Sequence, residues 1–145
     1  MNLPILFVSI YILVDIVYVS LSKGFYGNVA RRISGNGFPA FTATRVLGAL
    51  VAYGSMVAAW LFFVPIAVCH YQKTIRSNTI RPWMVGSLVG AMYGFVLYGV
   101  FNGSLHVMFQ NYDIPVVIRD MLWGVSWSTV LTAIYAYFAA SNCPK

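Results

Sequence analysis

The stretch Leu3–Ser22, LPILFVSIYILVDIVYVSLS, decides the fold of this chain. It is about 20 residues long and otherwise uncharged, so it is long enough to cross a bilayer as a helix. Its one charged residue is Asp15. A carboxylate at that depth costs at least about 2.5 kcal/mol unless it finds a partner, which marks Asp15 as a functional or structural position. The stretch therefore predicts a membrane protein with a polar site inside it.

The composition of the whole chain agrees with this interpretation. Of its 145 residues, 60% are hydrophobic and 8% are charged, whereas soluble domains carry about 25% charged residues. Nine Lys and Arg against three acidic residues give a net charge of +6, which suits contact with anionic lipid headgroups. The basic residues are spread along the connecting segments rather than gathered in a stripe, so nucleic-acid binding is not predicted.

Four apolar runs predict four spanning helices, at about residues 3–22, 45–68, 82–101 and 116–140. The expected fold class is all-α, a single polytopic domain (residues 1–145) built as an integral membrane four-helix bundle. An even number of spans puts both termini on the same side. Basic residues are almost equally frequent on the two sides, so the positive-inside rule gives only a slight preference for a cytoplasmic location of the 23–44 connection.

The connections between the spans carry most of the charge. Residues 25–33 could lie along the membrane surface as a short amphipathic segment. We expect the basic side chains of the first two connections to contact lipid or a partner protein: Lys23, Arg31, Arg32, Lys73, Arg76 and Arg81.

Polar residues of all four predicted spans fall at a similar depth. Asp15 lies about 10 Å before the end of its span and Asp120 about 7.5 Å after the start of its own, and the topology puts both at the same side of the membrane. The predicted intramembrane cluster comprises Asp15, Tyr18, Arg45, Asn102, Ser104, His106, Asp120 and Trp123. Such a cluster could lock the helices together, or it could bind or conduct an ion or solute.

Small residues recur every four positions in the last two spans. Gly86, Gly90 and Gly94 form a GxxxGxxxG pattern, and Gly124 and Ser128 begin a similar series. Such ridges let helix backbones approach closely. We expect them to serve packing inside the bundle, with a homo-oligomer interface as the alternative.

The sequence contains few motifs that would indicate catalysis or metal binding. The chain lacks GxSxG, HExxH and phosphate-loop motifs, and neither His70 nor His106 has a second ligand at metal spacing. Cys69 and Cys143 are far apart and form no CxxC pair, so neither a metal site nor a disulfide is predicted, although termini on one side could bring the two cysteines together. We therefore expect no enzymatic activity, no metal and no cofactor.

Three segments carry a resemblance to a known family: residues 15–26 (DIVYVSLSKGFY), 98–104 (YGVFNGS) and 120–124 (DMLWG). Together they resemble a family of small four-span membrane proteins of unknown function, described as predicted membrane proteins of bacteria and large DNA viruses. The family pattern has an Asp in the first span and Asp-x-x-Trp-Gly in the fourth, which fall here on Asp15, Asp120 and Trp123. The middle segment departs from the pattern, because Asn102 stands where the family has an Asp, and this makes the site less acidic.

Taken together, these features favour a non-enzymatic membrane protein with a structural or scaffolding role. The resemblance adds a setting, either a bacterial cell membrane or the internal membrane of a virus particle. There the protein would contact lipid, further copies of itself, or neighbouring membrane or capsid proteins. The alternative is a small ion, proton or solute transporter or channel that uses Asp15 and Asp120.

Overall fold

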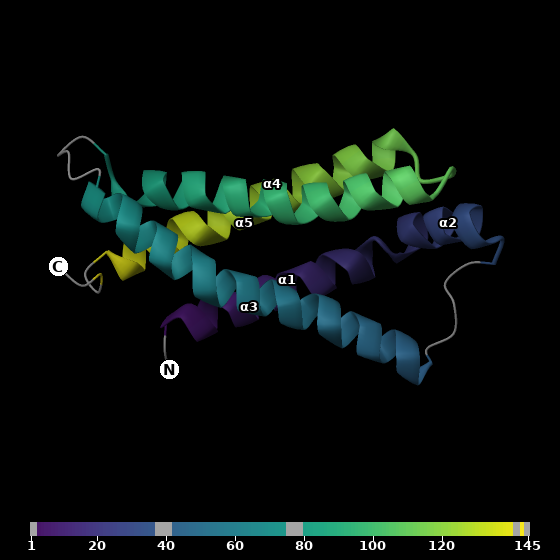
Figure 1. The fold of residues 1–145 in the computed structure, drawn as a ribbon, viewed down its shortest axis with the longest axis horizontal. Coiled ribbons are helices and arrows are strands. Elements are labelled where there is room, and N and C mark those ends of the chain that lie inside the picture. Colours follow the sequence, from purple (N-terminus) through teal and green to yellow (C-terminus); the bar gives the residue numbers. More distant parts are fainter. Residues whose placement is uncertain (1–2, 37–41, 75–79, 141–142, 144–145) are drawn as a thin grey trace.

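A computed structural model describes residues 3–36, 42–74, 80–140 and 143 of the chain. All regular structure within these ranges is helical, which confirms the predicted all-helical class. The five helices follow one another along an elongated molecule (Figure 1): α1 (Leu3–Leu21), α2 (Lys23–Ser34), α3 (Ala43–Thr74), α4 (Pro82–Met108) and α5 (Ile114–Ala139).

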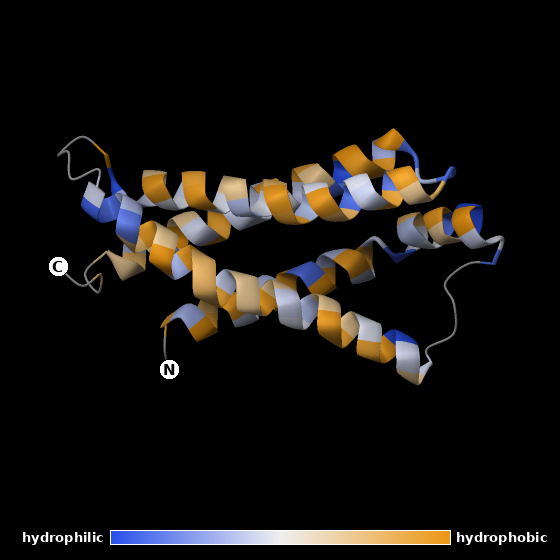
Figure 2. Cartoon of the chain, in the orientation of Figure 1, coloured by the Kyte–Doolittle hydropathy of each residue, from blue (hydrophilic) through white to orange (hydrophobic). Residues whose placement is uncertain are grey.

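The long helices run along the molecule, and α2 lies at one end of it (Figure 1). We call this end, where α4 also ends and α5 begins, the α2 end. The start of α1, the end of α3, the start of α4 and the end of α5 all lie at the opposite end, which we call the terminal end. Hydrophilic residues gather at both ends, with more of them inside α1 and the α4–α5 pair toward the α2 end (Figure 2).

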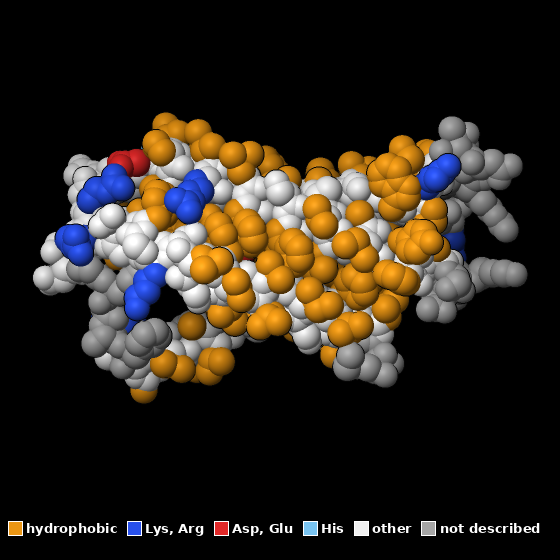
Figure 3. Space-filling view, turned by 180° about the vertical axis from the view of Figure 1, so that it is seen from behind, with side chains coloured by type: hydrophobic (Ala, Val, Ile, Leu, Met, Phe, Trp, Pro, Cys, Tyr) orange, Lys and Arg blue, Asp and Glu red, His pale blue; other side chains and the backbone are white. Residues whose placement is uncertain are grey.

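Three helices, α1, α3 and α4, are long and apolar enough to cross a membrane. Helix α5 has 26 residues and is also long enough, but it carries Arg119 and Asp120 in its second turn and several hydroxyl side chains further along. Large apolar side chains remain exposed along the helices (Figure 3), as expected where lipid is the solvent. The structure therefore supports a helical membrane protein with three clear candidate spans.

Helices α4 and α5 pack most closely, along their small residues. Cβ atoms built on Gly86, Gly90 and Gly94 would lie 2.4, 2.3 and 2.6 Å from backbone oxygens of α5. These distances leave no room for a side chain, so the two backbones are in direct contact. The residues predicted for helix packing, which also include Gly124 and Ser128, are all buried in this interface, which we call the α4–α5 seam.

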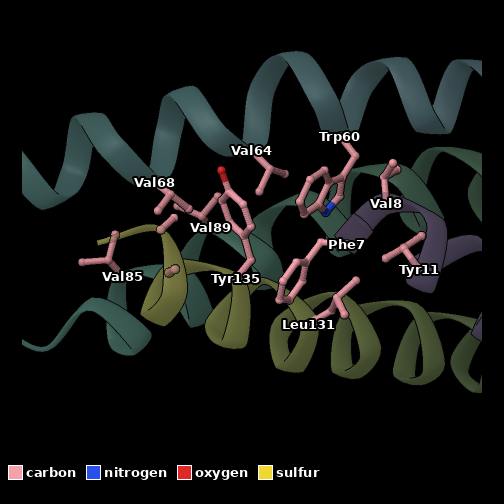
Figure 4. Packing of buried hydrophobic residues seen from close by; sticks show 12 residues of the cluster. Phe7, Val8, Tyr11, Trp60, Val64, Val68, Val85, Val89, Leu131 and Tyr135 are labelled. Atoms are coloured by element: carbon pink, nitrogen blue, oxygen red, sulfur yellow. The ribbon is translucent and has the colours of Figure 1, made fainter. Parts of the chain in front are cut away.

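The apolar core lies nearer to the terminal end, where α1, α3, α4 and α5 meet (Figure 4). Trp60 of α3 is fully buried, and its ring meets the edge of Tyr135 from α5 at a centroid distance of 5.1 Å. Phe7 of α1 meets the same tyrosine at 5.5 Å. The core thus combines aromatic rings, which bury much area with defined geometry, with valine side chains of α1, α3 and α4.

The segment that the sequence placed on the membrane surface is a helix, α2, which follows α1 after a single residue. Its Val29 is buried together with Tyr112 and Val116, so α2 packs under the connection between α4 and α5. The helix ends at Gly35, whose φ of 76° is the left-handed conformation that glycine adopts most readily.

Two predictions need correction, one about where α3 and α4 end and one about the two cysteines. Helices α3 and α4 continue to Thr74 and Met108, past the predicted limits of 68 and 101, because a helix can extend beyond the apolar run that sequence analysis detects. The prediction that Cys69 and Cys143 form no disulfide was also wrong. Cys69 and Cys143 are bonded, with 5.4 Å between their Cα atoms, because the ends of α3 and α5 meet at the terminal end.

Candidate functional site

Asp15 is buried at the point where four helices meet. Its Oδ1 accepts hydrogen bonds from the Tyr98 hydroxyl of α4 at 2.8 Å and from the Trp123 indole of α5 at 3.1 Å. Its Oδ2 accepts a bond from the Tyr53 hydroxyl of α3 at 3.3 Å. An ionised carboxylate is an acceptor only, so three donors from three other helices suit it well.

The small residues of the α4–α5 seam position one of these donors. A Cβ atom on Gly124 would lie 2.1 Å from the Tyr98 ring, so the ring rests directly on the α5 backbone. Trp123, the next residue of α5, stacks face to face on Tyr18 of α1 at a centroid distance of 3.9 Å. Close helix packing and the orientation of the polar groups around Asp15 are therefore coupled.

Asp120, the second buried acid, accepts a hydrogen bond from the Tyr26 hydroxyl of α2. The same hydroxyl lies 3.3 Å from that of Tyr18. Burial, and then the bond to Asp120, raise the pKa of Tyr26 well above its ordinary value, so this phenol keeps its proton and acts as a donor. These contacts join α2 to α5 and, through Tyr18, to the first helix.

Arg119 is a cation in contact with this group. Its guanidinium donates to the Tyr18 hydroxyl at 3.3 Å and to Ser22 at 3.2 Å. It also lies 4.1 Å from the centroid of the Phe25 ring, a cation–π arrangement. Arg119 thus ties the start of α5 to the junction between α1 and α2.

Asn102 is fully buried and forms a third part of the site. Its side-chain oxygen accepts a hydrogen bond from the Tyr112 hydroxyl at 2.5 Å, and its amide donates to the Tyr98 carbonyl at 2.9 Å. Burial raises the pKa of the Tyr112 phenol above its ordinary value, so it keeps its proton and serves as the donor. The His106 ring lies 2.6 Å from the Tyr112 carbonyl oxygen and closes the α2 end of the site.

The structure brings together most, but not all, of the predicted cluster. Asp15, Tyr18, Asn102, Asp120 and Trp123 share connected contacts, and His106 touches their edge. By contrast, Ser104 is exposed on α4, and Arg45 is exposed in the first turn of α3. This part of α3 diverges from the other helices (Figure 1), whereas the prediction assumed parallel spans.

Sequence analysis missed the tyrosines that donate to the buried acids, Tyr26, Tyr53 and Tyr98, and the one that donates to Asn102, Tyr112. Tyrosines near span ends are common at membrane interfaces, so their presence alone carried no signal. One signal was available for Tyr98. The four-residue series Gly86, Gly90, Gly94 continues to positions 98 and 102, which places Tyr98 and Asn102 on the same inward face of α4.

The residues predicted to contact lipid or partners lie at the two ends of the molecule. Lys23, Arg31 and Arg32 are exposed on α2, and Arg32 forms an ion pair with Asp113. Lys73 and Arg81 are exposed at the terminal end, while Arg76 lies outside the described residues. Basic side chains accordingly flank a broad apolar zone (Figure 3).

Within the described ranges, no group of three or more His, Cys, Asp or Glu side chains could hold a metal ion. The structure does contain one groove, of about 600 Å³, between α3 and α4. Its lining is almost wholly apolar and includes Phe63, Leu88 and Val96, but neither Asp15 nor Asp120. The buried acids therefore face protein donors rather than this groove.

Comparison with known proteins identifies the family. A family model described as predicted membrane protein (DUF2177) matches residues 3–138, so the chain belongs to this family. The resemblance inferred from the sequence is thereby confirmed. No curated protein matches the chain, and no solved structure matches it either.

Proposed function

We propose that this member of the predicted membrane protein family is a non-enzymatic, four-span protein with a structural role in its membrane. The carrying observation is that Asp15 of α1 accepts hydrogen bonds from α3, α4 and α5. A single buried carboxylate thus joins four helices. Hydrogen bonds between helices, together with close packing, hold a bundle together when lipid removes the hydrophobic drive for association.

The fourth span in this proposal is α5. Its contacts with α4 pair Gly86 with Thr132 and Gly94 with Gly124, so the two helices are antiparallel and lie side by side over much of their length. A helix in such contact with a spanning helix shares its depth in the bilayer. This supports a bundle with both termini on one side of the membrane.

The surroundings of the acids favour a structural role over catalysis. Both oxygens of Asp15 accept bonds from protein groups, and Asp120 is bonded to Tyr26. The groove between α3 and α4 offers an apolar lining that fits lipid chains rather than a polar substrate. A scaffolding role would then rest on the basic ends, which suit lipid headgroups or neighbouring proteins; membership of a virus particle stays a prediction from the resemblance.

One observation favours a transporter or channel as the second candidate. Tyr26 bridges Asp120 to Tyr18, whose ring stacks on Trp123, the partner of Asp15. The two buried acids are therefore linked by polar and aromatic groups within the bundle. Intramembrane acids occur in the proton relays of pumps and transporters.

Two measurements on the same purified variants separate these functions. Asp15→Asn keeps an acceptor oxygen but replaces the other with a donor, so we expect the thermal unfolding midpoint in detergent to fall by several degrees. Asp113→Asn, at a partly exposed position, is the matched control and should change the midpoint little. Wild-type protein in liposomes should show no proton or cation flux above that of empty liposomes.

The opposite pattern would overturn the structural proposal. If wild-type liposomes conduct protons or cations, and Asp15→Asn abolishes the flux without lowering the unfolding midpoint, the acids serve transport. An unchanged midpoint without any flux would also contradict the proposal, because it would show that Asp15 does not hold the helices.

A further inference from the structure

We propose that Cys69 and Cys143 are oxidised by the thiol-oxidising machinery of a non-cytoplasmic compartment, and that the terminal end of the molecule faces that compartment. The α2 end then faces the cytoplasm. The proposal concerns orientation and modification, and it does not depend on the structural role of Asp15.

The first observation is the cysteine pair itself. The chain has two cysteines, and the structure joins them by a disulfide across a sequence separation of 74. With no third thiol in the chain, one intramolecular pairing is possible. Disulfides form and persist in oxidising compartments and are rare in the cytosol, so this bond assigns a compartment to the end of the molecule that carries it.

The second observation is the position of the pair at an aqueous boundary. Cys69 lies in the last two turns of α3, followed by the exposed residues His70, Lys73 and Thr74. Gln72 donates to the Ala136 carbonyl of α5 at 3.2 Å, at the same level. The cysteines therefore lie where the apolar run of α3 gives way to polar residues, within reach of a soluble oxidant.

The third observation is the charge at the opposite end. Lys23, Arg31 and Arg32 are exposed on α2, and Arg119 of α5 contacts Ser22 at the same end of the molecule. Cytoplasmic connections of membrane proteins carry an excess of Lys and Arg. Charge counting alone leaves the orientation almost undecided, since Lys73 and Arg81 lie at the terminal end. The disulfide and the slight excess of Lys and Arg at the α2 end indicate the same orientation, with the α2 end in the cytoplasm.

The chemistry of the step is a thiol–disulfide exchange. The thiolate of one cysteine attacks the disulfide of a thiol–disulfide oxidoreductase and forms a mixed disulfide. The second cysteine then attacks the mixed disulfide and releases the oxidoreductase as a dithiol. The chain loses two protons and two electrons, and the oxidoreductase disulfide accepts both electrons and two protons as it becomes a dithiol.

The redox state is tested on the full chain in bacterial membranes. Cells are quenched with acid, and free thiols are then alkylated with a polyethylene-glycol maleimide that shifts the protein on a denaturing gel. We expect no shift without reductant and a shift for two thiols after reduction. In a host lacking its periplasmic thiol oxidant, both thiols should react without reductant. Two free thiols in the normal host would overturn the proposal.

The orientation is tested with single cysteines at matched positions. Thr74 and Ser34 are the last residues of α3 and α2, and both are exposed. In a chain with Cys69→Ser and Cys143→Ser, a membrane-impermeant maleimide should label Thr74→Cys on intact cells and Ser34→Cys only after permeabilisation. The reverse pattern, or labelling of both on intact cells, would overturn the orientation.

If the variant with Cys69→Ser and Cys143→Ser does not accumulate in the membrane, the labelling test is made in a second background. In this background, Thr74→Cys or Ser34→Cys is placed singly in a chain that keeps Cys69 and Cys143, which remain bonded and unreactive. The added cysteine is then the one thiol that the maleimide can label. The expected and contradicting patterns are unchanged. Failure of Asp15→Asn to alter stability would leave this labelling pattern untouched, so the two proposals fail separately.

Discussion

Helices α4 and α5 lie backbone against backbone, whereas α3 contacts the other helices through side chains, including the buried Trp60, Val64 and Val68, and through one covalent bond. In the α4–α5 seam, glycines bring backbone oxygens within 2.6 Å of where a Cβ atom would stand. On α3, Gly48 and Gly54 have no neighbouring atom within 4 Å of that position. Glycine therefore permits close backbone contact in the α4–α5 seam but has no such packing role at these two positions of α3.

This difference teaches how a small bundle can combine two modes of packing. The α4–α5 seam depends on the absence of side chains, which allows many weak contacts over the length of two helices. Helix α3 buries one face in the apolar core and adds specific contacts: Tyr53 to Asp15, the Met56 carbonyl to Tyr93, and Cys69 to Cys143. A substitution that disrupts the α4–α5 seam should destabilise the whole bundle, whereas loss of one specific contact of α3 should destabilise mainly α3.

Loss of the disulfide should have the largest effect and should separate the two regions. The bond closes a long loop, for which about 2 to 4 kcal/mol of unfolding free energy is typical. We expect Cys69→Ser with Cys143→Ser to speed amide hydrogen exchange in the second half of α3, with little change in the α4–α5 seam. Equal acceleration in both regions would show that α3 and the seam are not independent.

Gly90→Ala should cost about 1 to 3 kcal/mol, the usual range for overpacking, because its Cβ atom would lie 2.3 Å from the Ser128 carbonyl oxygen. Gly54→Ala on α3 is the matched control. It should leave stability unchanged or raise it slightly, since alanine favours the helix over glycine. Unfolding in a denaturing detergent measures both. A similar loss for the two variants would remove the distinction between the regions.

Tyr93→Phe should cost about 1 kcal/mol or less. It removes the hydroxyl that donates to the Met56 carbonyl at 2.9 Å but keeps the ring that packs against Tyr11. Tyr71→Phe, at an exposed position near the end of α3, is the control and should be neutral. Should Tyr93→Phe prove as neutral as Tyr71→Phe in the same unfolding assay, this contact would not hold α3.

The smallest effect is expected for Arg32→Gln. The ion pair between Arg32 and Asp113 is exposed on both sides, at 50% and 44%, and such pairs contribute between zero and about 1 kcal/mol. The bond from Asn111 to the Arg32 carbonyl survives the change. We expect a shift of the unfolding midpoint that disappears at high salt. A loss larger than that of Gly90→Ala would mean that the α2 end matters more than the seam.

The sequence predicted the small-residue faces of α4 and α5, because a four-residue repeat of small residues has a direct meaning in three dimensions. The series at positions 86, 90 and 94 must lie on one face of a helix, and the structure places that face against α5. The long apolar runs likewise predicted the positions of α1, α3, α4 and α5, although the ends of α3 and α4 extend further than the apolar runs.

The site was harder to predict, because its geometry depends on how the helices tilt. The prediction of the cluster assumed parallel spans, whereas the first turns of α3 diverge from the bundle (Figure 1). The donors Tyr53 and Tyr98 resemble any membrane-interface tyrosine in sequence. The bond between Cys69 and Cys143 was missed because residue spacing carries no information on which distant helix ends meet.

The central claim is that Asp15 joins the helices, and a double-mutant cycle with Tyr98 tests it most directly. The free energy of unfolding in detergent is measured for wild type, Asp15→Ala, Tyr98→Phe and the double variant, with Tyr137→Phe, exposed elsewhere on α5, replacing Tyr98→Phe in a control cycle. We expect a coupling of about 0.5 to 2 kcal/mol between Asp15 and Tyr98, and none with Tyr137. Additive effects of Asp15→Ala and Tyr98→Phe would contradict the account.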